Sequence, residues 1–504
     1  MKIKRKFLKT SPFEKNMKID IMKDICSLKV HTKYRKDLMF YLWILSALLL
    51  LSVLIGCHLG SDYEQPQFFD NQEIEQVLNL KPEKMPLDTS FFDFEDETLT
   101  HILILAMQNS PSLRSALVKV RQARSLFKIS ESDLMPSFDL NAKYNYLNAG
   151  KNMGVFSNED YYQTALDMTW EIDIFGANAK RLEAAKANLK GMIENLKNVH
   201  VSLISDMTMA YIKLRTTEWL LKNAKENVML QKNIYQTVQE QFDAGLVDEV
   251  TLNQSKYLLE TTRMSIPQLD FQRIEAQNTL ALLVGDLPTS LNDILSKQES
   301  NLVQKTFSYD LNKLYYLSAD VIRLRPDVRV AEEQLISGNA LVGAAIADMF
   351  PKVSLSGLLG FGTTQFSSLF NNASFETGIM PQISIPLLHF GALKNNVELK
   401  KAIKEEYLIA YENSLLVAAE EIHNAINKLK NESKRNQFAQ KAYDKMTKVS
   451  ELNWKKYKQG LIPYADVLDA EQRRLLAQTN MVNSNSALYQ GIVQYYKSIG
   501  GWGK

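Results

Sequence analysis

Histidine and cysteine, which often catalyse reactions or bind metals, are few in this sequence and are scattered along it. Its 504 residues include six histidines and two cysteines, which form neither an HExxH pair nor a Cys/His cluster with metal-ligand spacing. No Walker A sequence, GxSxG motif or glycine-rich phosphate loop occurs either. We therefore expect no enzymatic activity, no metal site and no cofactor.

One cysteine lies where a covalent modification is expected. A basic segment precedes an apolar run that ends in LIGC at residues 54–57, which is the order of a secretory signal. The ending resembles a bacterial lipobox, in which cleavage before the cysteine leaves Cys57 to be lipidated, although Ile55 is larger than the residue usual there. We interpret residues 1–57 as a signal peptide ending in a lipobox. The alternative is an uncleaved transmembrane anchor, because the run approaches the roughly 20 residues that span a bilayer.

The composition excludes three other classes of protein. Lys plus Arg is 59 and Asp plus Glu is 57, so the overall charge gives no case for a nucleic-acid partner. Hydrophobic residues make up 45% of the chain, which argues against disorder. Two cysteines cannot form a disulfide framework.

The sequence is internally duplicated with an offset of 215 residues. Pro111 matches Pro326, and 326 − 111 = 215. Further pairs keep this offset without a gap: Pro136 with Pro351, Phe175-Gly176 with Phe390-Gly391, Gly245-Leu246 with Gly460-Leu461, and Gly285 with Gly500. The period is far too long for a solenoid repeat, so each copy is a whole structural half. The expected parts are an N-terminal segment at 58–97, a first repeat at 98–290, a linker at 291–312 and a second repeat at 313–504.

Each repeat is expected to contain two strands. Apolar and polar side chains alternate over 137–147 and 163–174, and more weakly over 352–362 and 376–388, where Pro381 and Pro386 interrupt the pattern. These lengths suit a tilted membrane-spanning strand of about 9–11 residues. The alternative is a half-buried strand in a soluble sheet. The side chains expected to face lipid are Leu166, Met168, Trp170 and Ile172, and Tyr146 and Trp170 would suit an aromatic girdle.

Long helices are expected after each pair of strands. Helical hairpins are predicted at 177–284, turning at Gly245, and at 392–498, turning at Gly460. The first helix has an apolar seam with a mean spacing of 3.5 residues, which is typical of a coiled coil. An ordinary coiled-coil or spectrin-like rod would explain the hairpins but not the strands. The seam consists of Leu203, Met207, Ala210, Leu214, Thr217, Leu221, Ala224, Val228, Gln231, Tyr235, Val238 and Phe242.

Four strands cannot close a barrel, and lipid does not tolerate an open sheet edge, so copies of the chain must complete it. A dimer would give eight strands around a filled interior, and a trimer would give twelve around a water-filled pore. The polar residues Asp167, Glu171 and Asp173 on the inward face favour the trimer.

Four segments carry a family resemblance: RPDVRVAEEQLISGNALVGAAIADMFPKVSLSG at 325–357, WEIDIFGANAKRLEAA at 170–185, YKQGLIPYADVLDAEQRRL at 457–475 and IGGW at 499–502. They resemble the outer-membrane factors of bacterial tripartite efflux pumps, that is, the TolC-like family, and particularly its lipoprotein branch typified by OprM. The resemblance covers nearly all of the chain beyond about residue 60.

This resemblance implies a fold, a location and partners. The fold would be mainly helical with transmembrane β: a homotrimer whose twelve-stranded barrel continues into a twelve-helix periplasmic tunnel. The chain would lie in the outer membrane of a Gram-negative bacterium, anchored in its lipid. It would be the exit duct for drugs or other small molecules delivered by an inner-membrane pump, usually of the RND type, through a periplasmic adaptor. Two other classes of protein are possible alternatives. A periplasmic adaptor carries only one hairpin, and a structural coiled-coil envelope lipoprotein would lack the strands of alternating apolar and polar residues.

The resemblance also implies functional residues in both hairpins. Asp466 and Asp469 match aspartates that narrow the periplasmic entrance, and three copies would form two carboxylate rings that bind cations. Alternatively, they only solvate the start of a helix. The adaptor would dock on the hairpin tips, although a glycine there can simply cap a helix. The tip residues are Gly245, Leu246, Val247, Gly460, Leu461 and Ile462.

Overall fold

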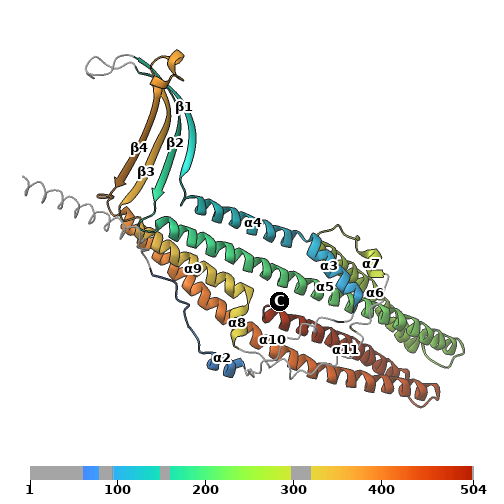
Figure 1. The fold of residues 1–504 in the computed structure, drawn as a ribbon. Coiled ribbons are helices and arrows are strands. Elements are labelled where there is room, and N and C mark those ends of the chain that lie inside the picture. Colours follow the sequence, from blue (N-terminus) through green and yellow to red (C-terminus); the bar gives the residue numbers. More distant parts are fainter. Residues whose placement is uncertain are drawn as a thin grey trace, which may run out of the picture. The chain divides into compact units, whose positions relative to one another are not determined.

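The structure is a computed structural model that describes residues 61–78, 94, 96–147, 159–296, 303 and 319–501. These residues fall into two compact units (Figure 1). The smaller unit contains residues 133–179 and 346–390 and holds a β-sheet, whereas the larger contains the remaining described residues and holds the long helices. The predicted signal peptide with Cys57 lies outside the described residues.

The sheet of the smaller unit is antiparallel, with its strands in the order β1-β2-β3-β4. The strands are β1 (Ser137–Leu147), β2 (Glu159–Ile172), β3 (Lys352–Thr363) and β4 (Phe375–Ser384). Between β3 and β4 lie two short 3-10 helices, η4 (Phe366–Ser368) and η5 (Asn372–Ser374). Pro381, which has no backbone N–H, lies opposite Leu355 in β4, the strand at one edge of this four-stranded sheet.

Two strands end earlier than the sequence pattern predicts. We expected the second strand to reach residue 174, but the Asp173 carboxylate accepts a 2.7 Å hydrogen bond from the backbone N–H of Ala179. Asp173 therefore belongs to the start of the following helix rather than to the polar face of the sheet. The fourth strand was expected to reach residue 388 but ends at Ser384, just before Pro386, which has no N–H to continue a ladder.

The register of the sheet separates apolar from polar side chains across all four strands. Leu166 is opposite both Leu140 and Leu359, and Leu359 is in turn opposite Thr377. One residue further along β2, Asp167 is opposite Asp139, and Asn141 donates a 2.7 Å hydrogen bond to the Asp167 carboxylate. Because side chains alternate along a strand, one face is mostly apolar and the other mostly polar.

The helices repeat the 215-residue offset of the sequence. Helices α4 and α9 have 22 residues each, α5 and α10 have 67 each, and the members of each pair start 215 positions apart. The long hairpins are α5 (Ala177–Asp243) with α6 (Glu249–Val284), and α10 (Ala392–Lys458) with α11 (Tyr464–Ser498). The shorter helices are α2 (Asn71–Leu78), α3 (Glu97–Asn109), α4 (Pro111–Ser132), α7 (Asn292–Ser296), α8 (Asp320–Leu324) and α9 (Pro326–Ala347).

The buried seam of α5 confirms the predicted coiled-coil spacing. Nine of its twelve predicted positions are buried, and the other three, Val228, Tyr235 and Phe242, are half-buried. Leu203, Met207 and Leu214 from the seam join a core with residues of α3, α6, α7 and α11. A second core joins α8, α9, α10 and α11 with Leu78 of α2. None of the described helices is long and apolar enough to span a bilayer.

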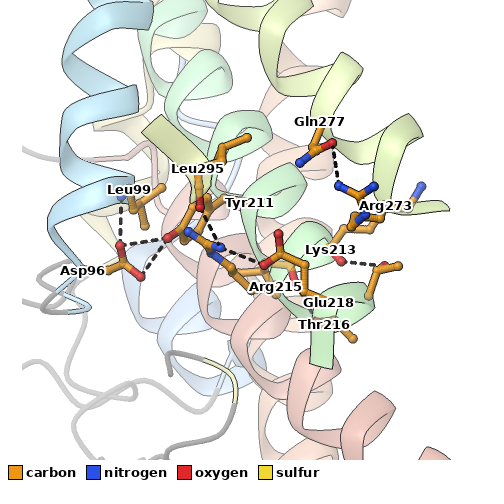
Figure 2. A network of polar contacts seen from close by, with 12 residues as sticks. Asp96, Leu99, Tyr211, Lys213, Arg215, Thr216, Glu218, Arg273, Gln277 and Leu295 are labelled. Atoms are coloured by element: carbon orange, nitrogen blue, oxygen red, sulfur yellow. Dashed lines mark hydrogen bonds and ion pairs between the residues drawn. The ribbon is translucent and has the colours of Figure 1, made fainter. Parts of the chain in front are cut away.

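A buried polar network holds α3 and α7 against α5 (Figure 2). The Tyr211 hydroxyl lies 2.9 Å from both carboxylate oxygens of Asp96, which also accepts from the backbone N–H of Leu99 and so caps α3. The Arg215 guanidinium lies 4.9 Å from the Tyr211 ring centre and contacts the Leu295 carbonyl of α7. Burial raises the pKa of Tyr211 to about 12, so its hydroxyl stays protonated and donates. Tyr211 is fully buried, which makes this network structural.

Candidate functional site

The two hairpin tips have the same backbone conformation. Gly245 and Gly460 have φ angles of 71° and 72°, in the left-handed region that favours glycine. The next N–H bonds back to a carbonyl five residues earlier: Leu246 to Gln241 at 2.8 Å, and Leu461 to Lys456 at 3.0 Å. This is the pattern of a Schellman motif, so both glycines do cap helices.

The aliphatic residues that follow each tip glycine differ in their exposure. The leucines are exposed, Leu246 by 75% and Leu461 by 67%. Val247 and Ile462 instead pack against a small apolar cluster, which we call the tip cluster. Its buried members are Ile234 and Val238 of α5 and Tyr464 and Val467 of α11.

Aromatic side chains join the two hairpins next to this cluster. The Tyr457 hydroxyl of α10 donates a 2.8 Å hydrogen bond to the Gln241 side chain of α5. The Tyr457 ring stacks on Trp454 at 5.6 Å and meets Tyr464 edge-on at 5.5 Å between ring centres. The three rings all belong to the second hairpin, so the two tips are joined by this hydrogen bond and by the apolar contacts of the tip cluster. Since 216 residues separate Tyr457 from Gln241, sequence periodicity could not reveal this pairing.

Both predicted gate aspartates lie on one exposed face at the start of α11. Asp466 is in the first turn, where a negative charge interacts favourably with the helix dipole. Asp469 is one turn further on, and Arg473 approaches its carboxylate to 2.9 Å. The prediction from the sequence did not include Arg473, although a spacing of four residues from Asp469 favours an ion pair on one face of a helix. Both carboxylates are exposed to solvent, and Arg473 partly neutralises the charge of Asp469.

A buried ion pair lies directly behind these aspartates. Arg474 and Glu471 are 8% and 5% exposed, and their side chains are 3.0 Å apart. Glu471 also accepts a hydrogen bond from Ser450 of α10. Arg474 reaches Asn227 of α5 at 3.0 Å, and Asn227 in turn donates to Gln478 at 3.0 Å. This network ties the aspartate-bearing part of α11 to both of its neighbouring helices.

The sheet places all four predicted lipid-facing residues on its apolar face. Leu166, Met168, Trp170 and Ile172 are alternate residues of β2, and their partners on β3 are Leu359, Gly357, Leu355 and Val353. The Trp170 indole N–H donates to the Leu134 carbonyl at 3.0 Å. At the other end of this face Tyr162 contacts the rings of Tyr144 and Phe366, with ring centres 5.0 and 5.4 Å away.

The described residues contain no group of three or more His, Cys, Asp or Glu side chains that could hold a metal ion. A duplicated chain with an amphipathic antiparallel sheet and two long hairpins that carry acidic and exposed apolar tips has the architecture of an outer-membrane channel subunit. The family model for the outer membrane efflux protein matches residues 102–286 and again 317–501. The chain belongs to the outer membrane efflux protein family.

Individual relatives are similar over nearly their whole length. The solvent efflux pump outer membrane protein SrpC of Pseudomonas putida is 27% identical over 470 residues, which is 90% of this chain and 96% of SrpC. The probable outer membrane lipoprotein SilC of Salmonella typhimurium is 25% identical over 471 residues, 92% of this chain and 99% of SilC. The outer-membrane channel OprN has a TM-score of 0.80 and 28% identity, covering 88% of this chain and 99% of OprN. The mainly helical fold, the outer-membrane location and the role as an efflux exit duct are confirmed.

Proposed function

We propose that three copies of this chain form the duct, with a twelve-stranded barrel in the outer membrane and a twelve-helix tunnel in the periplasm. The observation that carries this proposal is the sheet register, which gives one apolar face across four strands while leaving β1 and β4 without outer partners in the described chain. Unpaired strand edges are not stable in lipid, so each β1 must pair with the β4 of another copy.

The dimensions of the apolar face agree with a membrane span. Tyr162 and Trp170 mark its two aromatic ends and are eight residues apart on β2 (170 − 162 = 8). At about 3.3 Å per residue this is a distance of about 26 Å. Because barrel strands tilt by about 35–45°, this distance corresponds to a height of about 20 Å, near the outward apolar band of about 25 Å that has aromatic girdles at both edges.

The assembly is tested by the mass of the detergent-solubilised protein and by its mobility on denaturing gels. We expect a trimeric mass and a band that migrates as a trimer without heating and as a monomer after boiling. A monomer or dimer in mild detergent would rule out the twelve-stranded barrel.

An arginine on the apolar face of the sheet should hinder membrane assembly. Leu166→Arg places a charge near the middle of the proposed lipid-facing band, which costs about 2–4 kcal/mol in such barrels. We expect a several-fold loss of heat-modifiable trimer in outer-membrane fractions. Thr169→Arg is the matched control, because Thr169 lies on the polar face and should be tolerated. Equal losses for the two variants would show that the faces are assigned wrongly.

Asp466 and Asp469 are proposed to form two carboxylate rings that restrict the entrance and bind cations. Mg²⁺ on the periplasmic side of a planar bilayer should therefore reduce the channel current. Asp466→Asn should relieve this block more than Asp469→Asn does, because Arg473 already neutralises part of the charge of Asp469. Block that neither variant relieves would contradict the proposed rings, whereas equal relief by both would show that Arg473 does not weaken the ring of Asp469.

The hairpin tips are the proposed docking points of a periplasmic adaptor, which connects the duct to an inner-membrane pump, usually of the RND type. Burying one exposed leucine is worth about 1.5–3 kcal/mol, so Leu461→Ala should weaken adaptor binding about 10- to 100-fold. The measurement is the amount of adaptor that co-purifies after chemical cross-linking in the envelope. Leu416→Ala, on an exposed position of α10 away from the tip, is the control and should have no effect.

Lipidation of Cys57 is proposed from the LIGC sequence and from the similarity to SilC, which is described as a probable outer membrane lipoprotein. A Cys57→Ser variant should lose the mass of the lipid from the mature protein.

We also propose that drugs or other small molecules pass through the duct. The relative SrpC is described as the outer membrane protein of a solvent efflux pump. Because the proposed role of the chain is a passive duct, selection of the substrate is expected to occur in the pump.

A further inference from the structure

A cavity beside the first hairpin is lined by uncharged side chains. Its volume is about 560 Å³, within the range of roughly 300–1,000 Å³ that is typical of small-molecule sites. Residues of α5, α6 and α11 form its walls, and none of the 17 described residues that line it is charged, although 23% of the whole chain is. We call this site the neutral cavity. Its lining contains six side-chain amides: Asn223, Asn227, Gln268, Gln272, Gln472 and Gln478.

The duplicated counterpart of the neutral cavity is cationic. This counterpart is a groove between α10 and α11 in the second hairpin. Arg435 and Arg473 line the groove 215 positions after Leu220 and Leu258, which line the neutral cavity. The two hairpins therefore present equivalent helix surfaces, with leucines in one repeat and arginines in the other. The lack of charge belongs to the side chains of the first repeat and not to the hairpin architecture.

The hydroxyl groups of α6 in this cavity can accept hydrogen bonds but have already donated their protons. Thr261 and Thr262 both donate to the Leu258 carbonyl of their own helix, at 3.0 and 2.7 Å. Ser265 donates to the Thr262 carbonyl at 2.7 Å. A hydroxyl group has one proton and two lone pairs, so these oxygens can still accept from an O–H or N–H group of a bound molecule.

Asn223 offers the opposite half of a hydrogen bond. Its side-chain nitrogen is buried and has no acceptor in the described part of the chain. A buried donor without an acceptor is unfavourable, so an oxygen acceptor on a bound molecule would be favoured here. Asn227, the other amide that α5 contributes, already bonds Gln478 and Arg474, at 3.0 Å each. The charge of Arg474 is in turn paired with Glu471.

We infer that the neutral cavity binds an uncharged molecule that carries hydroxyl or amide groups on an apolar body. Both the donors and the acceptors of such a molecule find partners in the lining. An ionised group would lose its water without gaining a counter-ion. The apolar body would contact the aliphatic part of the lining, which contributes by removing apolar area from water. This part contains Leu220, Leu258, Leu269, Leu475 and Leu476.

The neutral cavity shares a face of α11 with one of the proposed gate aspartates. Leu476 lines the cavity, is 62% exposed and follows Asp469 by seven residues, a spacing that returns to the same face of a helix after about 10 Å. The inference rests here on the proposed entrance, because the cavity lies in the wall of the duct only if Asp469 faces the duct. Binding there delays an uncharged molecule on its way out, while the choice of substrate stays with the pump.

A matched pair of fluorescent glycosides tests the chemistry of the site. The uncharged probe is 4-methylumbelliferyl β-D-glucoside, which carries hydroxyl groups on an aromatic body, and the corresponding glucuronide has a carboxylate in place of one hydroxymethyl group. The full chain is held in lipid nanodiscs, because glycoside detergents would compete, and binding is followed by the fluorescence anisotropy of each probe. We expect the glucoside to bind at least about tenfold more tightly than the glucuronide.

Two variants locate this binding in the neutral cavity. Asn223→Leu removes the unpaired donor at similar volume and should weaken glucoside binding about tenfold. Leu220→Arg introduces the cation that Arg435 supplies in the second repeat and should reverse the preference in favour of the glucuronide, a gain that misfolding cannot produce. Asn233→Leu, at an exposed position of α5 outside the lining, is the control and should bind both probes like the unmodified chain.

Equal binding of the two probes, or an unchanged preference in Leu220→Arg, would overturn the inference. The position in the duct has its own measurement: the glucoside should reduce the current through the protein in planar bilayers, and Asn223→Leu should relieve this reduction. Binding in the cavity without any effect on the current would overturn the assignment to a transported molecule. A monomeric native mass would refute the proposed homotrimer but not the cavity, because one chain supplies its whole lining.

Discussion

Replacing Arg474 with methionine is expected to lower the free energy of unfolding by about 3–5 kcal/mol, as breaking a buried ion pair usually does. The variant leaves the Glu471 carboxylate, which is only 5% exposed, without its cation. It also removes the hydrogen-bond donor to the side-chain amide oxygen of Asn227. The measurement is thermal or chemical unfolding of the detergent-solubilised protein followed by helical circular dichroism.

Two further variants show whether the loss comes from an unpaired charge. Glu471→Met combined with Arg474→Met removes both charges from the buried site and should recover most of the lost stability. Arg473→Met breaks only the exposed pair with Asp469 and should cost less than about 1 kcal/mol. If the double variant lost as much stability as Arg474→Met and Glu471→Met lose together when each is measured singly, the ion pair would not be the cause.

The faces of the strands and of the long helices were predictable because they depend on local periodicity. Alternation along β2 already placed Leu166 and Asp167 on opposite faces, and the register of the sheet extends this separation to the neighbouring strands. In the same way, the mean spacing of 3.5 residues between apolar side chains predicted the seam of α5 that is buried in the structure. The end of β2 was predicted wrongly because the Asp173 carboxylate accepts a hydrogen bond from the first turn of α5. The alternation of apolar and polar residues gives no information about this contact.

The contacts that join the hairpins could not be predicted from the sequence. Arg474 meets Asn227 across 247 residues, and Tyr211 meets Asp96 across 115, so periodicity on either helix says nothing about the partner. The ion pair between Asp469 and Arg473 is different, since its spacing of four residues within one helix is visible in the sequence. Local pairs in the candidate site were thus accessible to sequence reasoning, whereas pairs that require the fold were not.

The packing of Tyr464 leads to the second large expected effect. Tyr464 is 4% exposed, and it packs with Ile234 and Val238 of the other hairpin in the tip cluster. Replacing a buried aromatic residue with alanine lowers the free energy of unfolding by about 3–5 kcal/mol. Tyr464 belongs to neither of the two larger cores, so we expect this loss at the tips. If the joined tips are the closed state of the proposed entrance, Tyr464→Ala should shift the equilibrium strongly towards an open one.

The expected result for Tyr464→Ala is a large rise in single-channel conductance in planar bilayers, with the trimeric mass unchanged. Tyr464→Phe keeps the ring and should conduct like the unmodified protein. Tyr457→Phe removes only the hydrogen bond to Gln241, worth about 1 kcal/mol, and should raise the open population about fivefold. Leu461→Ala, at the exposed tip, should leave conductance unchanged while weakening adaptor binding. Unchanged conductance in Tyr464→Ala, together with faster hydrogen exchange at the tips, would mean that the tip cluster stabilises the hairpins without closing the entrance.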